Sequence, residues 1–271
     1  MNILILIAVG AGGLLALWLV QTLVLTAVGA KSVFAWPMRH DSDSSVVRWV
    51  MKAAVQAVLL ALLLLPPWLT GESPWDYHAE RLSAVSWKIP VLGGGLTLFL
   101  FSAVMLVNWL VGWITLEPHM GRSKLLTKLG RASLTPLPLA IMEELVFRGI
   151  ILEQMLRSLP DHPIGQGAAL TLSAALFASV HFLRYQKQLL LPAVGLFVLG
   201  WTLGLVYLAC GHTIWGAAAF HAAGVWFIQM TRPFASYHGP AWLIGYRSYP
   251  ICGVYGLGVM LLLTGWVIMM T

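Results

Sequence analysis

Residues 141–149 have the sequence Ile-Met-Glu-Glu-Leu-Val-Phe-Arg-Gly, which places two carboxylates and a guanidinium inside a segment that is otherwise almost entirely apolar. An ionised side chain in hydrocarbon is costly unless it is paired or faces water. On a helix, Glu144 and Arg148 are four residues apart and share a face, so they can pair. Glu143 points about 100° away from Glu144 and can act on another group. A carboxylate held by a cation beside a second carboxylate is typical of general acid–base chemistry, with Glu143 as the candidate base.

The composition places this segment in a membrane. The chain has 271 residues, of which 59% are hydrophobic and 10% charged, far from the composition of soluble globular proteins. That length accommodates about eight spans of about 20 residues with short connections. We expect them near residues 3–29, 46–69, 89–116, 135–158, 167–183, 189–209, 213–231 and 251–270. The predicted fold is all-α, a polytopic membrane helical bundle of about eight transmembrane helices in which residues 1–271 form a single integral-membrane domain.

The net charge of +6 follows this topology and does not indicate nucleic-acid binding. If the chain crosses the membrane eight times, most basic residues fall on one side: Lys31, Arg39, Arg48, Lys52, Arg122, Lys124, Lys128, Arg131, Arg184, Lys187, Arg232 and Arg247. The other side holds Arg81, Lys88 and Arg157 among acidic residues. This positive-inside pattern predicts cytoplasmic loops at 117–134 and 184–188, with both termini outside the cytoplasm. A composition rich in Ala, Gly and Leu favours a prokaryotic source, so we expect a prokaryotic cell membrane. The lipid bilayer is an expected partner because of the apolar spans.

Two histidines lie at membrane depth in apolar surroundings, where a lone imidazole needs a partner. His181 is near the cytoplasmic end of the fifth predicted span, and His221 is near the middle of the seventh. The three helices can therefore bring Glu143, Glu144 and both histidines together at one depth. Such a group can bind a divalent metal such as zinc, or activate water directly.

A structural interpretation of each residue is also available. A single intramembrane histidine is often a hydrogen-bonding residue between helices, and Glu144 with Arg148 can be a structural ion pair. The structural interpretation does not explain Glu143, because no second cation lies within one helical turn of it. Four such residues on three helices at compatible depth favour a functional site.

Missing motifs narrow the chemistry. The chain has no His-Glu-x-x-His, so a zincin-type site is excluded, and no Gly-x-Ser-x-Gly, which weakens a serine mechanism. No Glu-x-x-His pair is present, which argues against a ferritin-like di-iron site. All four aspartates lie outside the predicted spans, which excludes an aspartate-dyad protease: Asp41, Asp43, Asp76 and Asp161.

Three ordered motifs carry a family resemblance: Glu143-Glu144-x-x-x-Arg148-Gly149, Phe177-x-x-x-His181, and His221 at mid-helix. They resemble the motifs of the CAAX protease and bacteriocin-processing (CPBP, or ABI) family, the intramembrane glutamate or metallo-endopeptidases that include the type II CAAX prenyl endopeptidases. The resemblance covers residues 135–231, the expected protease core. It implies a helical membrane bundle with a site open toward the cytoplasm. The implied activity is hydrolysis of a membrane-associated peptide or protein near the cytoplasmic membrane face.

The resemblance also implies a role for each residue of the site. Glu143 would activate a water together with His181, and His221 would help form the site and stabilise the oxyanion. Glu144, counted with the catalytic residues, would hold the arrangement together with Arg148. Phe177 would be a structural support. Family members are described both as metal-dependent and as metal-independent, so zinc, if bound, would be held by Glu143, His181 and His221.

One position departs from the family pattern. The family usually has a small polar residue four positions after the third-motif histidine, where this chain has Val225. Loss of one oxyanion donor typically costs about 100- to 1000-fold in rate. Two other interpretations therefore stay open. One is a non-catalytic scaffold or immunity protein of the same fold. The other, less favoured because no inverted repeat is visible, is a proton-coupled transporter.

Overall fold

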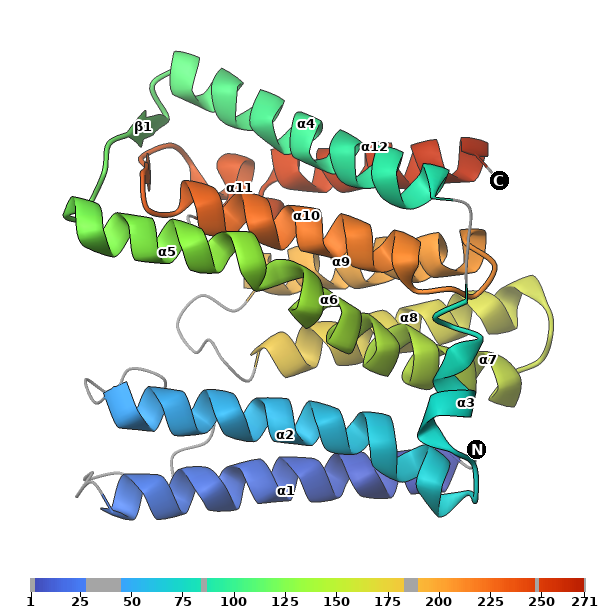
Figure 1. Ribbon diagram of the computed structural model, residues 1–271. Helices are drawn as coiled ribbons and strands as arrows, with labels where there is room; N and C mark the ends of the chain where they lie inside the picture. Colours follow the sequence, from blue (N-terminus) through green and yellow to red (C-terminus); the bar gives the residue numbers. More distant parts are fainter. Residues whose placement is uncertain (1–2, 28–44, 84–86, 183–189, 247–248, 271) are drawn as a thin grey trace.

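The computed structural model describes residues 3–27, 45–83, 87–182, 190–246 and 249–270. They form a bundle of long helices with one small two-stranded sheet, which confirms the all-α prediction (Figure 1). The helices are α1 (Ile3–Ala27), α2 (Ser45–Leu69), α3 (Pro74–Ala79), α4 (Lys88–Leu110), α5 (Arg122–Leu134), α6 (Pro136–Glu144), η1 (Leu145–Leu152), α7 (Glu153–Ser158), α8 (Pro163–Phe182), α9 (Leu190–Ala209), α10 (Trp215–Thr231), α11 (Ala241–Ile244), η2 (Pro250–Cys252) and α12 (Val254–Met270). The strands are β1 (Ile114–Leu116) and β2 (Ala235–Tyr237).

Each predicted span contains a long helix, and the stretch 135–158 is one helical path through α6, η1 and α7. Among the described residues, three helices are long and apolar enough to cross a membrane: Lys88–Leu110, Pro163–His181 and Leu191–Ala209. The number of eight spans stays a prediction. One boundary was wrong, because α4 ends at Leu110 and not near residue 116. The chain turns there at Gly112, whose φ of +81° suits glycine, and then enters β1.

The segment 117–134, predicted to be a loop, contains the helix α5. This helix carries four basic residues and therefore lacks the long apolar run of a membrane span. β1 pairs with β2 in antiparallel register, with Ile114 opposite Tyr237, and this joins the chain after α4 to the chain after α10. The predicted 184–188 loop lies outside the described residues, as do Lys31, Arg39 and Arg247.

Helix α10 is central to the bundle because it packs against α4, α6 and α9, and α8 packs against α9 (Figure 1). α1 and α2 form an antiparallel hairpin beside this group. The α4–α10 contact is close at Gly93, where a Cβ atom would clash with the ring of Phe220. Phe220 precedes His221 in the chain, so this contact fixes the helix that carries the histidine.

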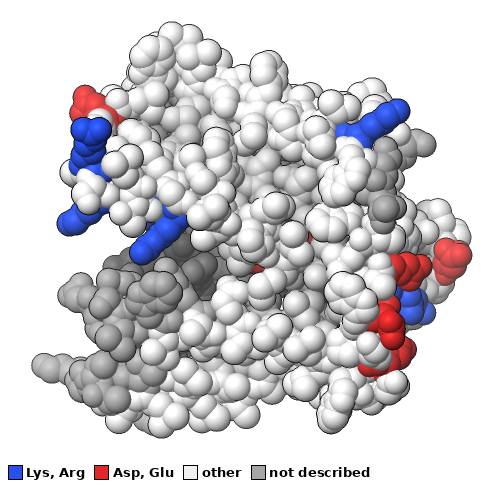
Figure 2. Space-filling view, in the orientation of Figure 1, with Lys and Arg blue, Asp and Glu red and all other residues white. Residues whose placement is uncertain are grey.

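Charged side chains gather at opposite ends of the molecule in Figure 2, and an uncharged band separates them. Acidic groups dominate the end formed by α3 and α7, and basic groups dominate the end where α5 begins. Large apolar side chains are exposed on the long helices between these ends, including Phe99, Leu172 and Leu261. This distribution is the one expected of a protein whose middle faces lipid.

A polar cluster that was not predicted from the sequence lies at the acidic end. Glu153 Oε2 accepts hydrogen bonds from Tyr207 (3.1 Å) and from Nδ1 of His212 (2.8 Å). Glu153 Oε1 accepts from Arg157 at 3.2 Å. The pair Glu153–His212 thus joins α7 to the connection between α9 and α10.

The hydrogen bond that His212 donates to Glu153 raises the pKa of His212 above its ordinary value, although burial and the charge of Arg81 act in the opposite direction. The stability that protonation of His212 contributes through this pair is therefore fully present below the unfolded-state pKa of His212, about 6.5, as long as Glu153 is ionised. It is lost as the pH rises through the higher folded-state pKa.

We expect His212→Asn to lower the thermal unfolding midpoint of the detergent-purified protein at acidic pH, with the difference from wild type shrinking at alkaline pH. Asparagine suits this position because His212 has a φ of +63°. His162→Ala, at an exposed position of the same end, is the control. A destabilisation of the same size at every pH would show that ionisation of His212 does not contribute.

Candidate active site

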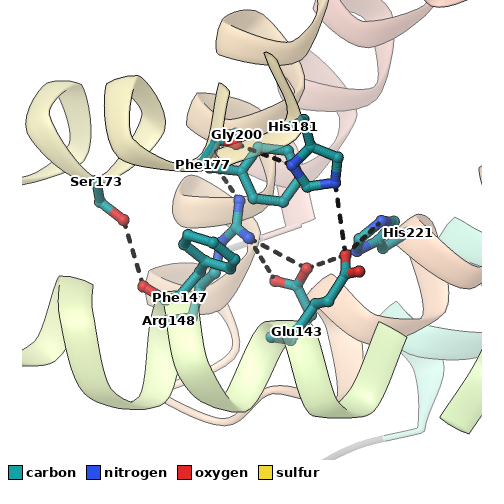
Figure 3. A network of polar contacts seen from close by, with 9 residues as sticks. Glu143, Phe147, Arg148, Ser173, Phe177, His181, Gly200 and His221 are labelled. Atoms are coloured by element: carbon teal, nitrogen blue, oxygen red, sulfur yellow. Dashed lines mark hydrogen bonds and ion pairs between the residues drawn. The ribbon is translucent and has the colours of Figure 1, made fainter. Parts of the chain in front are cut away.

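The structure brings Glu143, His181 and His221 together from α6, α8 and α10 (Figure 3). The Nε2 atom of His181 lies 3.8 Å from Oε2 of Glu143. The Nε2 atom of His221 lies 3.6 Å from the same oxygen. Both imidazoles therefore address one carboxylate oxygen, at distances long enough for a water to bridge the groups.

The other ring nitrogen of His181 determines how the imidazole can act. Its Nδ1 lies 2.8 Å from the carbonyl oxygen of Phe177, one turn earlier in α8. A carbonyl only accepts, so Nδ1 carries the hydrogen and donates it. In the neutral imidazole, Nε2 then has the lone pair, and this atom faces Glu143. His181 is thus set up to accept a hydrogen bond or a proton on the side of the carboxylate.

Glu144 is fully buried and has two partners from different helices. Its Oε1 accepts from Nη1 of Arg148 at 3.1 Å, as the four-residue spacing predicted. The same oxygen accepts from Nδ1 of His221 at 2.7 Å, which we did not predict. Glu144 therefore orients the imidazole of His221 so that its Nε2 faces Glu143.

Arg148 holds three helices together. Its Nη2 donates to the carbonyl of Gly200 in α9 at 2.8 Å. The guanidinium also lies over the ring of Phe177 in α8, 4.8 Å from the centroid. Both groups of the Glu144–Arg148 pair are buried. Because neither charge can reach water, each one depends on the opposite charge of the other.

Phe177 occupies the centre of these contacts and is completely buried. Its ring lies 4.4 Å from that of His181 and 5.1 Å from that of Phe147, measured between centroids. Gly200 lets α9 approach this ring, because a Cβ there would lie only 3.2 Å from Phe177 Cδ1. Phe177 therefore supports the imidazole of His181 and the guanidinium of Arg148.

The helix that carries the motif changes form directly after Glu144. Residues Leu145–Leu152 form a π-helix, whose wider turn is rare and is often found at functional sites. The Phe147 carbonyl accepts a hydrogen bond from Ser173 of α8 at 3.3 Å. This bond ties the π-helix to the helix of His181.

An apolar cavity of ≈ 110 Å³ adjoins the two histidines. Val225 and Gly224 of α10 line it together with His181 and His221. Val225 thus faces the same space as the histidines, where the family pattern has a polar side chain. Gln229, one turn further on, accepts from Thr135 at 3.3 Å and is not part of the lining.

Glu143, His181 and His221 have the donor types of a zinc site. Within the part of the chain that the structure describes, however, no group of three His, Cys, Asp or Glu side chains is arranged to hold a metal ion. Zinc held by these three residues stays a prediction, and the mechanism proposed below includes no metal step.

Comparison with known proteins agrees with the motifs. Residues 126–227 match the model of the Rce1-like family, described as type II CAAX prenyl endopeptidase Rce1-like. This match confirms the resemblance to the CAAX protease family, and it overlaps the expected core at 135–231. No curated protein and no solved structure matches the chain.

We expect Glu144→Ala to lower the free energy of unfolding by about 3–5 kcal/mol, because it leaves Arg148 as an unpaired buried charge. Unfolding of the purified protein by sodium dodecyl sulfate in mixed micelles measures this loss. Glu143→Ala should cost far less, since its side chain is 14% exposed and holds no buried cation. The double variant Glu144→Leu/Arg148→Met should recover much of the stability, because no charge is then stranded. If Glu144→Ala were as stable as wild type, the pair would not hold the bundle together.

Proposed function

From the CAAX protease match over residues 126–227, we propose that this protein is an intramembrane endopeptidase. It hydrolyses a peptide bond of a membrane-associated peptide or protein near the cytoplasmic face of a prokaryotic cell membrane. The observation that carries the proposal is the convergence of two imidazole Nε2 atoms on one oxygen of Glu143. A single domain of residues 1–271, with its protease core at 135–231, provides this site.

In the proposed first step, a water lies between Oε2 of Glu143 and Nε2 of His181. The Nε2 lone pair accepts one hydrogen bond from the water, because Nδ1 donates to the Phe177 carbonyl. Glu143 takes a proton from the water as the oxygen bonds to the peptide carbonyl carbon. The carbon–nitrogen bond then breaks, and Glu143 passes the proton to the leaving amine.

His221 acts on the charge that develops at the carbonyl oxygen. Its Nδ1 hydrogen is held by Glu144, and Nε2, when it carries a hydrogen, donates to the oxyanion. Val225 adds no donor beside it, so His221 is the main oxyanion group contributed by α10. Glu144 also holds Arg148 in place. One carboxylate therefore positions both His221 and Arg148.

The basic end of the bundle leads into the helix that carries Glu143, which supports cleavage near the cytoplasmic face. The basic helix α5 leads through Thr135 into α6, and α6 carries Glu143. The positive-inside rule assigns this basic end to the cytoplasm and both termini to the other side. Arg232, directly after α10, belongs to the same basic end.

The second candidate function is a non-catalytic scaffold or immunity protein of the same fold. Val225 favours it, because an oxyanion donor is missing where the family has one. A transporter is a third candidate, in which Glu143 and the histidines would relay protons.

We expect Glu143→Gln and His181→Ala each to lower turnover by at least about 100-fold, because each removes a group that activates the water. The assay follows new N-termini by mass spectrometry when the reconstituted protein acts on membrane peptides of its own host. His119→Ala, at an exposed site outside the cavity, is the control. Wild-type turnover should persist after chelation of metals; complete loss, restored by zinc, would support the metal-dependent alternative.

The cellular role separates the two main candidates. If a deletion strain is rescued by both Glu143→Gln and His181→Ala, proteolysis is not needed and the scaffold function is correct. Rescue by wild type alone supports the endopeptidase.

Val225→Asn should raise turnover, by up to about 100-fold, because the amide can donate to the oxyanion from the helix face of His221. Val225→Ala, which also trims the side chain but adds no donor, is the matched control. A clear loss of activity in Val225→Asn alone would mean that this position contacts an apolar part of the substrate.

A further inference from the structure

Helix α5 has no part in the proposed hydrolysis, yet it concentrates charge. Its thirteen residues include Arg122, Lys124, Lys128 and Arg131, and no acidic residue. At about 100° per residue, Lys124, Lys128 and Arg131 fall within about 60° of one another on the helix surface. All three are exposed. We call these three residues the basic stripe.

The other faces of α5 divide between protein and solvent. Ala132 is 2% exposed and Leu125 and Leu129 are partly buried, on the side that packs against α10 and α6. Leu126 and Leu134 are instead 59% and 76% exposed. A helix with a basic stripe and exposed leucines has the side-chain types that contact lipid headgroups and the acyl chains next to them.

Within the described residues, the basic stripe is not neutralised by carboxylates. Among the residues that the structure describes, no carboxylate forms an ion pair with Lys124, Lys128 or Arg131. The acidic side chains gather mainly at the opposite end, beyond the uncharged band (Figure 2). The described part of the chain therefore leaves the charge of α5 available to an anionic partner.

The position of α5 indicates which partner this is. The helix begins at the basic end of the molecule, outside the uncharged band (Figures 1 and 2). Lipid headgroups occupy this level in a bilayer, and basic residues near a membrane surface attract anionic lipids. The exposed leucines can enter the acyl boundary beside those headgroups.

We propose that the basic stripe of α5 binds the phosphate groups of anionic lipids. The consequence for the site is mechanical. Thr135, at the end of α5, donates a hydrogen bond to Gln229 of α10, and α6 begins at the next residue. Lipid held by α5 thus fixes the depth of the two helices that carry Glu143 and His221. This inference does not depend on proteolysis.

Native mass spectrometry of the full-length protein in detergent tests the proposal by titration with phosphatidylglycerol or phosphatidylcholine. Wild type should bind phosphatidylglycerol more tightly. Lys128→Gln/Arg131→Gln should weaken that binding about 30-fold and leave phosphatidylcholine binding unchanged. Raised salt should reduce the preference of wild type, because these charges are exposed.

The matched control is Lys88→Gln/Arg157→Gln, which removes the same charge from exposed positions at the other end. Equal binding of the two lipids by wild type would overturn the proposal, and so would equal losses in both double variants. An acidic peptide that binds wild type but not Lys128→Gln/Arg131→Gln, with no preference between the lipids, would also overturn it. The basic stripe would then be a site for acidic segments of a protein.

Discussion

The buried ion pair of Glu144 and Arg148 is the interaction on which this structure depends. Neither group can be left without a partner in an apolar interior, so the bundle must supply one for every charge placed there. The guanidinium meets this requirement with a carboxylate of its own helix, a carbonyl of α9 and an aromatic face of α8. The carboxylate in turn holds the imidazole of α10. Four helices are thereby fixed around a single pair of charges.

This constraint also explains the separation of tasks between two adjacent glutamates. Glu144 has its oxygens committed to Arg148 and His221, and it is fully buried. Glu143 is one residue earlier, so its side chain leaves the helix in a different direction and meets both Nε2 atoms. Glu144 is structural in its contacts, whereas Glu143 faces both imidazoles, although the two residues are chemically the same.

Much of this arrangement was predictable from the chain alone. The Glu144–Arg148 pair follows from helical spacing, and the proximity of Glu143 to two histidines follows from comparing depths along three helices. The bond between Glu144 and His221 was not predictable, because it depends on the rotation of α10 about its own axis. The Gly200 carbonyl is a backbone group, and backbone acceptors have no sequence signature. α5 was not predicted because it buries little apolar surface, and its sequence therefore contains no long apolar run.

The π-helix of residues 145–152 sets the angular relation between the two polar clusters of the molecule. Each residue of a π-turn advances less about the helix axis than a residue of an α-helix does. Glu144, before this stretch, faces His221 of α10, while Glu153, after it, faces Tyr207 and His212. A single deletion between them would rotate one cluster out of phase with the other. The length of this segment is therefore under tighter constraint than the identity of most of its side chains.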